Sequence, residues 1–387
     1  MADRLRQKIL SLDDFDAAAR RHLPRPLYGF VAGAAETDAA LHGNRAAFAD
    51  YRFVPRTLVD TSARSAATSL FGESYTAPFG IPPMGAAALI AYRADLALAG
   101  AAAKAGIPFV LSGSSLIRME DVARAGGKPW FQAYLPGDPA RIDALVDRAA
   151  AAGYGTFVLT VDVPVGANRE NNVRNGFSLP LRPGPQLAWQ GVTHPLWLWR
   201  TAARTLLRHG MPHFENFAAT QGPPILSRGL DRQLGARDTL AWPHLAQIRK
   251  RWRGRLVVKG ILAPDDARMA RDEGVDGIIV SNHGGRQLDY AQAPLHALPG
   301  IRAVAGTMAV MLDGGVRRGT DVLKAVALGA DFVFAGRPFL FAAAVAGADG
   351  VAHAIRLLRE EIERDMALLG ITSLRQMTPD LLAPRHR

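Results

Sequence analysis

The chain has 387 residues, 49% of them hydrophobic, which is enough to bury one large core or two ordinary ones. It contains no cysteine, so disulfides, thiolate metal sites and a cysteine nucleophile are excluded. A net charge of +11 attracts polyanions, but the basic residues are dispersed and not interleaved with aromatics, so we expect no nucleic-acid partner.

The N-terminal sequence MADRLRQKILSLDDFDAAARRHLP is charged throughout and lacks the apolar core of a secretory signal. The longest mostly apolar stretch, 82–91, is shorter than the roughly 20 residues that a membrane-spanning helix needs. We therefore expect a cytoplasmic protein without a transmembrane segment. Residues 1–75 are predicted to form an N-terminal helical segment.

Short apolar runs alternate with amphipathic stretches over 76–370, as in consecutive βα units. The helical patterns between them begin near Asp, Pro or Thr and end at Gly, as helix caps require. An open doubly wound sheet is the alternative, but no run precedes the GxGxxG turn that a dinucleotide needs. The sequence thus predicts an α/β fold, a (β/α)8 TIM barrel in a single domain over 1–387. Its eight candidate strands are GIPPMG (80–85), IPFVLSG (107–113), PWFQAYL (129–135), TFVLTVDVP (156–164), RLVVKGI (255–261), GIIVSNH (277–283), MAVMLDGGV (308–316) and FVFAGRPF (332–339).

A long insertion, 171–241, is predicted after the fourth strand, within the barrel. It contains no recognisable βα unit and is longer than a loop that merely connects two elements, so we expect a lid, an interaction surface or local disorder. The stretch 194–210 predicts a helix that would lie on an anionic membrane, or pack on its own barrel or on an oligomer partner. Its basic stripe is Arg200, Arg204 and Arg208, and its apolar face is Leu196, Trp199, Ala203, Leu206 and Leu207.

Polar residues gather at the C-terminal ends of the predicted strands, where barrel enzymes carry their chemistry. Glycines followed by arginines after the seventh and eighth strands indicate a phosphate site, although either turn alone would be read as a tight loop. After the sixth strand, His283 is a candidate base that Asp162 could orient, and Arg286 could bind a carboxylate. A lone histidine there would more often be structural.

The motif SNHGGRQLD (281–289) resembles the active-site signature of the FMN-dependent 2-hydroxy acid dehydrogenase/oxidase family, which includes glycolate oxidase, L-lactate dehydrogenase and mandelate dehydrogenase. The resemblance covers most of the chain, through motifs in the same order. They are GFVAGAAET (29–37), FQAY (131–134), LTVDVPVGANRE (159–170), VVKGI (257–261), DGGVRRGTDVLKAVALGA (313–330) and FAGRPF (334–339).

The resemblance implies that an L-2-hydroxy acid of the lactate or mandelate type is oxidised to the 2-oxo acid, with His283 as base and hydride transfer to flavin N5. It implies non-covalent FMN, no metal and a homotetramer. Asp162 would be the partner of His283, and Tyr134 would hydrogen-bond the reacting oxygen. Arg286 and Arg169 would bind the carboxylate, and Lys259 would stabilise reduced flavin. The remaining cofactor contacts would be Pro83, Met84, Ser112, Gln132, Thr160 and Ser281 around the isoalloxazine, and Asp313, Gly315, Arg317, Gly336 and Arg337 around the ribityl phosphate.

Two positions depart from the family pattern. Phe30 stands where the family usually has a tyrosine at the substrate, and the family's small residue after the first strand aligns near Met84. Both changes favour a larger or less polar substrate. One alternative is therefore an FMN-barrel oxidase for a bulky aromatic or peptide-derived substrate. A second, supported only by the long insertion, is a non-catalytic membrane or protein interaction module. Whether the electron acceptor is oxygen, a quinone or a protein stays open, as does peripheral contact of 186–220 with the inner face of the cytoplasmic membrane.

Overall fold

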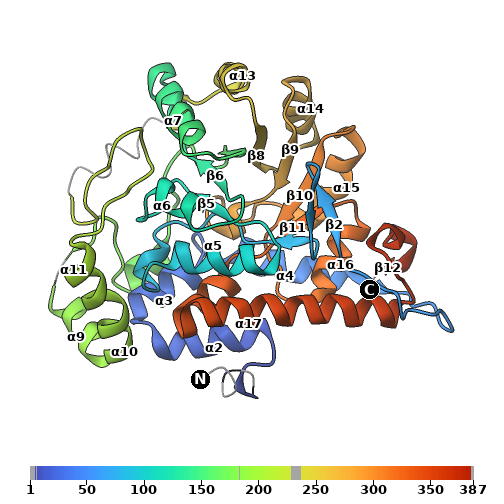
Figure 1. Ribbon diagram of the computed structural model, residues 1–387, viewed down its shortest axis with the longest axis horizontal. Coiled ribbons are helices and arrows are strands. Elements are labelled where there is room, and N and C mark those ends of the chain that lie inside the picture. Colours follow the sequence, from blue (N-terminus) through green and yellow to red (C-terminus); the bar gives the residue numbers. More distant parts are fainter. Residues whose placement is uncertain (1–4, 6, 183, 228–236, 385–387) are drawn as a thin grey trace.

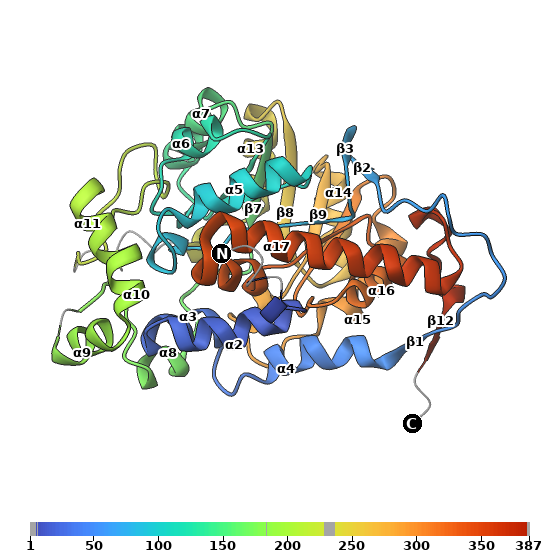
Figure 2. The ribbon, with the colours of Figure 1, turned by 60° about the horizontal axis from the view of Figure 1, so that its bottom comes forward.

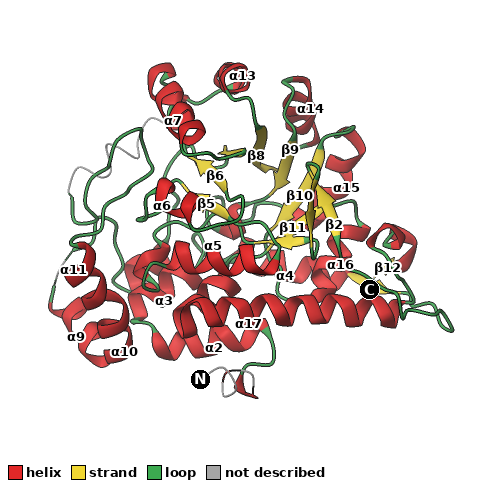
Figure 3. Cartoon of the chain, in the orientation of Figure 1, coloured by secondary structure: helices red, strands yellow, loops and turns green. Residues whose placement is uncertain are grey.

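The computed structural model describes residues 5, 7–182, 184–227 and 237–384. Parallel strands form its centre (Figure 3). The eight strands pair in the order β4-β11-β10-β9-β8-β7-β6-β5. The ring closes between β4 and β5, because Ile81 N donates to Pro108 O at 3.0 Å and Val110 N donates to Ile81 O at 2.9 Å. The predicted TIM barrel and its eight strands are confirmed. The strands are β4 (Phe79–Gly80), β5 (Val110–Ser112), β6 (Trp130–Ala133), β7 (Thr156–Thr160), β8 (Arg255–Ile261), β9 (Gly277–Val280), β10 (Ala309–Asp313) and β11 (Phe332–Phe334).

A helix follows each strand and covers the outside of the barrel (Figure 1). The expected caps are present: the Asp138 carboxylate accepts from Ala140 N and Arg141 N at the start of α7, and α5 ends at Gly106 with φ 68°. The helices are α5 (Ala94–Ala105), α6 (Met119–Arg124), α7 (Pro139–Ala151), α13 (Trp242–Arg251), α14 (Pro264–Asp272), α15 (Pro294–Val304), α16 (Gly319–Ala327) and α17 (Arg337–Leu369).

Helix α17 is the one helix in the described part of the chain with the length and apolar composition to cross a membrane. It is broken at Ala346 and Gly347, which leave helical geometry. It packs against α5 and α2 (Leu12–His22), and 67% of its most apolar stretch is buried (Figures 1 and 2). Its apolar side chains therefore belong to the protein core.

The barrel interior is a packed core rather than a channel. Its N-terminal end is closed by a hairpin of β2 (Thr68–Leu70) and β3 (Glu73–Tyr75), whose turn residue Phe71 packs near Gly277 at the start of β9. The hairpin joins the interior cluster of Val110, Trp130, Val158, Val257, Ile279, Met311, Phe332 and Phe334. This packing leaves the opposite, C-terminal end for a site.

The N-terminal segment is helical only in part. Helices α2, α3 (Arg25–Ala32) and α4 (Ala39–Ala46) are followed by a 3₁₀ turn at Ala47–Asp50. Beyond it the helical prediction is wrong, because residues 51–75 contain the hairpin and β1 (Tyr51–Phe53), which pairs antiparallel with β12 (Leu382–Pro384). These short strands are mostly exposed or half-buried, so they lack the buried apolar run that marks the barrel strands in the sequence.

The insertion forms α8 (Glu170–Arg174), α9 (Pro185–Thr193), α10 (Pro195–Trp197), a π-helical turn at Leu198–Ala203, α11 (Arg204–His209) and a 3₁₀ turn at Arg237–Thr239. Helices α9 to α11 project from the side of the barrel (Figures 1 and 2), and the helix predicted within 194–210 is confirmed. One side of it docks on the barrel, where Trp197 Nε1 donates to Leu89 O at 2.9 Å and Arg204 lies 4.0 Å over the Tyr92 ring.

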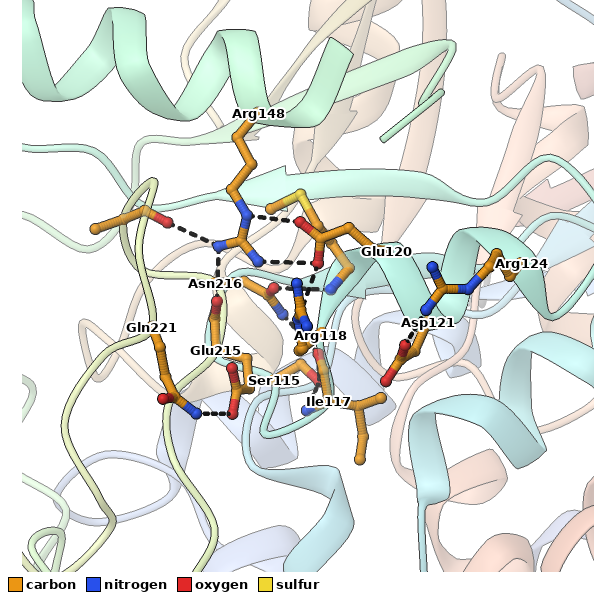
Figure 4. Close-up of polar contacts among 12 residues, drawn as sticks. Ser115, Ile117, Arg118, Glu120, Asp121, Arg124, Arg148, Glu215, Asn216 and Gln221 are labelled. Atoms are coloured by element: carbon orange, nitrogen blue, oxygen red, sulfur yellow. Dashed lines mark hydrogen bonds and ion pairs between the residues drawn. The ribbon is translucent and has the colours of Figure 1, made fainter. Parts of the chain in front are cut away.

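The returning part of the insertion is fastened to the barrel by a polar network (Figure 4). Arg148 of α7 binds both oxygens of Glu120, at 2.8 and 3.0 Å, and donates to the carbonyls of Glu215 and Ala218. The Arg148 hydrogen bond lowers the pKa of Glu120, as expected of an ionised bidentate pair. Asn216 is fixed beside it, since its Oδ1 accepts from Met119 N at 2.9 Å.

Candidate active site

Two cavities meet at the C-terminal end of the barrel. The inner cavity lies over the ends of β4, β10 and β11 and is lined by Pro83, Met84, Arg317 and Arg337 among others. The outer chamber, of about 550 Å³, lies under the insertion. Both are lined by Phe30, Gly85, Tyr134, His283 and Arg286. A group in the inner cavity and a molecule in the outer chamber would therefore touch at this junction.

His283 is oriented by Asp162, because its Nδ1 lies 2.8 Å from Asp162 Oδ1. A carboxylate can only accept, so Nδ1 carries the proton and the unprotonated Nε2 accepts from the Tyr134 hydroxyl at 3.4 Å. Burial lowers the pKa of His283, assisted by Lys259 and opposed by Asp162. Burial alone would raise the pKa of Asp162, but its interactions with His283 and Lys259 outweigh this and lower it. The pair is thus a neutral imidazole held by a carboxylate.

Lys259, at the end of β8, is a buried cation rather than a solvated strand end. Its Nζ lies 2.8 Å from Asp313 Oδ2 and donates to Ser281 Oγ at 2.6 Å. Burial disfavours the charged form, but Asp313 and Asp162 outweigh it, so the pKa of Lys259 is raised. Ser281 also accepts from His283 N at 3.0 Å and lines neither cavity, so it supports Lys259 and His283 from behind.

Arg286 and Arg169 stand on the wall of the outer chamber. The Arg286 guanidinium donates to the carbonyls of Phe30 and Gly33, at 2.7 and 2.8 Å. Arg169 donates to Arg286 O and to Gln287, at 3.2 and 2.9 Å. Within the described ranges no carboxylate pairs with either guanidinium, and burial together with the neighbouring arginines lowers the pKa of Arg286. Two half-buried cations without a paired carboxylate favour an anionic ligand.

The inner cavity fits a phosphorylated planar cofactor. Arg337 opens α17 and is buried against carbonyls, including Val31 O at 2.9 Å, and this burial lowers its pKa to about 9. Arg317, Gly315 and Gly336 line the same end, and Gly315, with φ 83°, admits no side chain because a Cβ would lie 2.4 Å from Asn44 O. A helix N-terminus, glycines and arginines together form a phosphate cradle.

Three buried polar atoms at the C-terminal ends of β6, β7 and β10 have no partner among the described residues. Gln132 Nε2, Thr160 Oγ1 and Asp313 Oδ1 are buried and have no hydrogen-bond partner in the described structure. Ser112 Oγ donates to Gln132 Oε1 at 3.2 Å, so the Gln132 amide nitrogen is available to donate to another group. Buried polar atoms are rarely left unpaired, and the edge of an isoalloxazine offers matching donors and acceptors. Of the predicted FMN contacts, Ser112, Gln132 and Ser281 do not line the inner cavity. The contacts that do line it are Pro83, Met84, Thr160, Lys259, Asp313, Gly315, Arg317, Gly336 and Arg337.

Phe30 and Gly85 lie on the substrate side of the site. Phe30 lies at the junction, where its ring stacks on Phe177 at 4.4 Å. Gly85 lines both cavities, whereas Met84, which aligns near the family's small residue, lines the inner cavity alone. A Cβ on Gly85 would lie 2.9 Å from Ser114 Cβ. Because small residues follow one another over GAAA (85–88), the sequence alone did not show which of them lines both cavities.

Sequence reasoning missed Arg237, whose guanidinium lies 4.5 Å from the centroid of the Tyr134 ring in the outer chamber. It belongs to a stretch without strand pattern or motif, so its arrival at the site depends on how the insertion folds back. Its spacing in the sequence from the other site residues did not indicate that it lies near them.

Known proteins were compared with the whole chain. The profile described as FMN-dependent dehydrogenase matches residues 19–384. Relatives include (S)-mandelate dehydrogenase of Pseudomonas putida, 38% identical over 379 residues, with 97% of this chain and 94% of the relative covered. L-lactate dehydrogenase of Pectobacterium atrosepticum is 40% identical over 374 residues, with 95% of each covered.

Solved structures agree with these relatives. The monotopic membrane protein (S)-mandelate dehydrogenase matches with a TM-score of 0.92 at 36% identity, over 98% of this chain and 100% of that one. A soluble mutant of the membrane-associated (S)-mandelate dehydrogenase from Pseudomonas putida gives 0.82 at 34% identity, over 97% and 100%. As its motifs predicted, the chain belongs to the FMN-dependent dehydrogenase family, with FMN as its cofactor.

Proposed function

We propose that this enzyme oxidises an L-2-hydroxy acid of the lactate or mandelate type to the 2-oxo acid. The observation that carries the proposal is the junction of the two cavities at the His283–Asp162 pair. The named relatives are L-lactate and (S)-mandelate dehydrogenases, which supports the substrate class. FMN, when bound, supplies the acceptor for two electrons.

Each side chain at the junction has one task in this proposal. Arg286 and Arg169 bind the substrate carboxylate, which supplies the counter-charge that the two guanidiniums lack. His283 Nε2 takes the hydroxyl proton while the C2 hydrogen leaves with its electron pair, and Asp162 stabilises the imidazolium that results. Tyr134 hydrogen-bonds the oxygen that becomes the carbonyl, and Lys259 places a positive charge beside the acceptor.

The cofactor contacts follow the same geometry. Arg337, Arg317, Gly315 and Gly336 would hold the phosphate end of FMN, and Asp313 would accept from the ribityl chain while it pairs with Lys259. Gln132 and Thr160 would satisfy the ring edge with their unpaired atoms, and Ser112 would orient the Gln132 amide. Pro83 and Met84 would cover the ring.

Anaerobic mixing tests the reaction. The purified holoenzyme, mixed with L-lactate, (S)-mandelate and their D/(R) enantiomers without oxygen, should lose flavin absorbance with the L/(S) acids only. Flavin that stays oxidised with every acid would contradict the proposal, and would favour the non-catalytic interaction module. Reoxidation by oxygen or a quinone, followed in the same cuvette, identifies the acceptor class.

We also propose that α9 to α11 bind the anionic inner face of the cytoplasmic membrane. The helices expose Trp189, Trp199 and Leu207 at 65%, 68% and 83%, beside the exposed Arg200 and Arg208. Such a face, apolar with basic flanks, is typical of interfacial helices. The likeness to a protein described as monotopic supports this. Co-flotation of the full chain with phosphatidylglycerol vesicles tests it, and Leu207→Asp should reduce flotation without changing flavin reduction.

The homotetramer implied by the family resemblance stays a prediction of this proposal. Light scattering of the detergent-free protein measures its mass. A monomer mass would contradict the prediction and would leave the catalytic proposal intact.

A further inference from the structure

Arg237 gives the outer chamber a third cation. The chamber is lined by Arg169, Arg286 and Arg237, and none of its described lining residues is Asp or Glu. Arg169 and Arg286 are the pair that the proposed function uses for the substrate's 2-carboxylate. Arg237 comes from the far end of the insertion, so it reaches the chamber independently of them.

The Arg237 guanidinium is stacked but not hydrogen-bonded. It lies 4.5 Å from the centroid of the Tyr134 ring and 5.9 Å from that of Phe217. No hydrogen bond or ion pair joins it to a described residue. Ring faces stabilise the charge without engaging the N–H donors, which lie in the guanidinium plane. Burial lowers the pKa of Arg237, and only Tyr134 opposes this shift. Its donors are therefore available to a ligand with an acceptor.

The position of Arg237 is fixed by its neighbours. Gly137 N donates to Thr239 Oγ1 at 3.0 Å, and a Cβ on Gly137 would lie 2.3 Å from Thr239 O, so only glycine allows this approach. Phe217, the second ring near Arg237, stacks on Phe214 at 4.7 Å in the segment that Arg148 fastens to the barrel. A prearranged cation costs little ordering entropy when an anion binds.

The chamber is also larger than lactate requires. Its volume of about 550 Å³ lies within the roughly 300–1,000 Å³ of sites for drug-sized ligands. Phe30, Phe177, Phe214 and Phe217 give it apolar walls. A substrate that fills this space would place an apolar middle against the rings and its far end near Arg237.

We propose that Arg237 is a specificity-determining residue, and that the preferred substrates are 2-hydroxy acids whose apolar or aromatic side chain ends in a second carboxylate. This rests on the proposed function, because the 2-carboxylate is taken to occupy Arg286 and Arg169. The second carboxylate would receive the N–H donors of Arg237, which lines the same chamber.

Three acids of similar shape test the proposal on the holoenzyme. They are mandelate, 4-carboxymandelate, and 4-nitromandelate as a planar control without the second charge. The wild type should reduce flavin with a higher kcat/KM for 4-carboxymandelate than for 4-nitromandelate. Arg237→Met should lower that ratio by roughly ten- to a hundredfold, the usual effect of a hydrogen bond to a charged group. Arg237→Lys, which keeps the charge without the planar fork, should retain part of the preference.

Arg204→Met is the matched control, since it removes a guanidinium that is stacked on Tyr92 outside the chamber. It should leave the ratio unchanged. Binding of 4-carboxyphenylacetate against phenylacetate, by calorimetry, gives a readout without turnover. A wild-type ratio near one, or a ratio that survives Arg237→Met, overturns the inference while oxidation of mandelate still supports the proposed function. Failure of all three acids and of L-lactate to reduce the flavin overturns both.

Discussion

Replacing Phe30 with tyrosine tests where the substrate carboxylate lies. The Phe30 ring stands between Phe177, at 4.4 Å, and the Arg286 guanidinium, at 5.1 Å from its centroid. Arg286 is itself held by Phe30 O at 2.7 Å. Phe30→Tyr keeps the ring and both stacking contacts, and adds one donor beside the cation that binds the carboxylate.

The magnitude follows from the kind of bond. A hydrogen bond to a charged group contributes about 1.5–3 kcal/mol, and 1.36 kcal/mol is tenfold, so the KM for a small acid should fall by roughly 10- to 100-fold. In the proposed site L-lactate would bind mainly through its carboxylate and should gain most. (S)-Mandelate would add apolar contacts with the chamber walls and should gain less.

Steady-state kinetics of the wild type and Phe30→Tyr on both acids measure the difference. Phe177→Tyr adds the same hydroxyl to the stacked partner ring and serves as the control. Equal gains on lactate and mandelate, or none on lactate, would mean that Phe30 only packs and that the carboxylate lies elsewhere.

Three further outcomes are expected. His283→Gln should keep FMN bound but slow flavin reduction by roughly 10²- to 10⁴-fold in stopped-flow mixing, and near-wild-type reduction would reject His283 as the base. The base must be neutral and burial lowers the His283 pKa, so kcat/KM should fall only as pH drops below the ordinary range of histidine. Asp162→Asn removes the charge that raises this pKa, so the acidic side of the pH profile should move to lower pH as the maximal rate falls. A shift of the profile to higher pH would contradict the pairing of His283 with Asp162. Arg337→Met should weaken FMN binding by about 10- to 100-fold, the scale of a charged hydrogen bond, as measured by ultrafiltration of free flavin, and full retention of FMN would remove Arg337 from the phosphate site.

The barrel and most of its site could be predicted because strand ends carry local signals. Each buried strand, of two to seven residues, is followed within a few residues by polar or glycine residues. Asp162 lies two positions beyond β7, and His283 lies three positions beyond β9. A closed barrel brings all such ends to one face. That rule placed His283, Asp162 and Lys259 together without any knowledge of their contacts.

The remainder depends on packing between distant segments. The pairing of Tyr51–Phe53 with Leu382–Pro384 joins three-residue strands that have no pattern of their own. Arg237 reaches Tyr134 only because Arg148 and Gly137 fasten the returning insertion to the barrel. Distinguishing Gly85 from Met84 required knowing which residue has no room for a Cβ.

Strands β7 and β8 pair directly, from Thr156 with Arg255 to Thr160 with Lys259, although the whole insertion lies between them in the sequence. The insertion therefore leaves and re-enters the barrel at adjacent points. The entropic cost of closing a longer loop is only slightly greater than that of closing a shorter one. One contiguous segment carries both the exposed apolar helices and the outer-chamber wall with Arg237. Exchanging this segment between homologous barrels at the β7–β8 boundary would therefore move the proposed membrane-binding helices and the proposed substrate selectivity together. The barrel strands that carry the flavin site would keep their pairing.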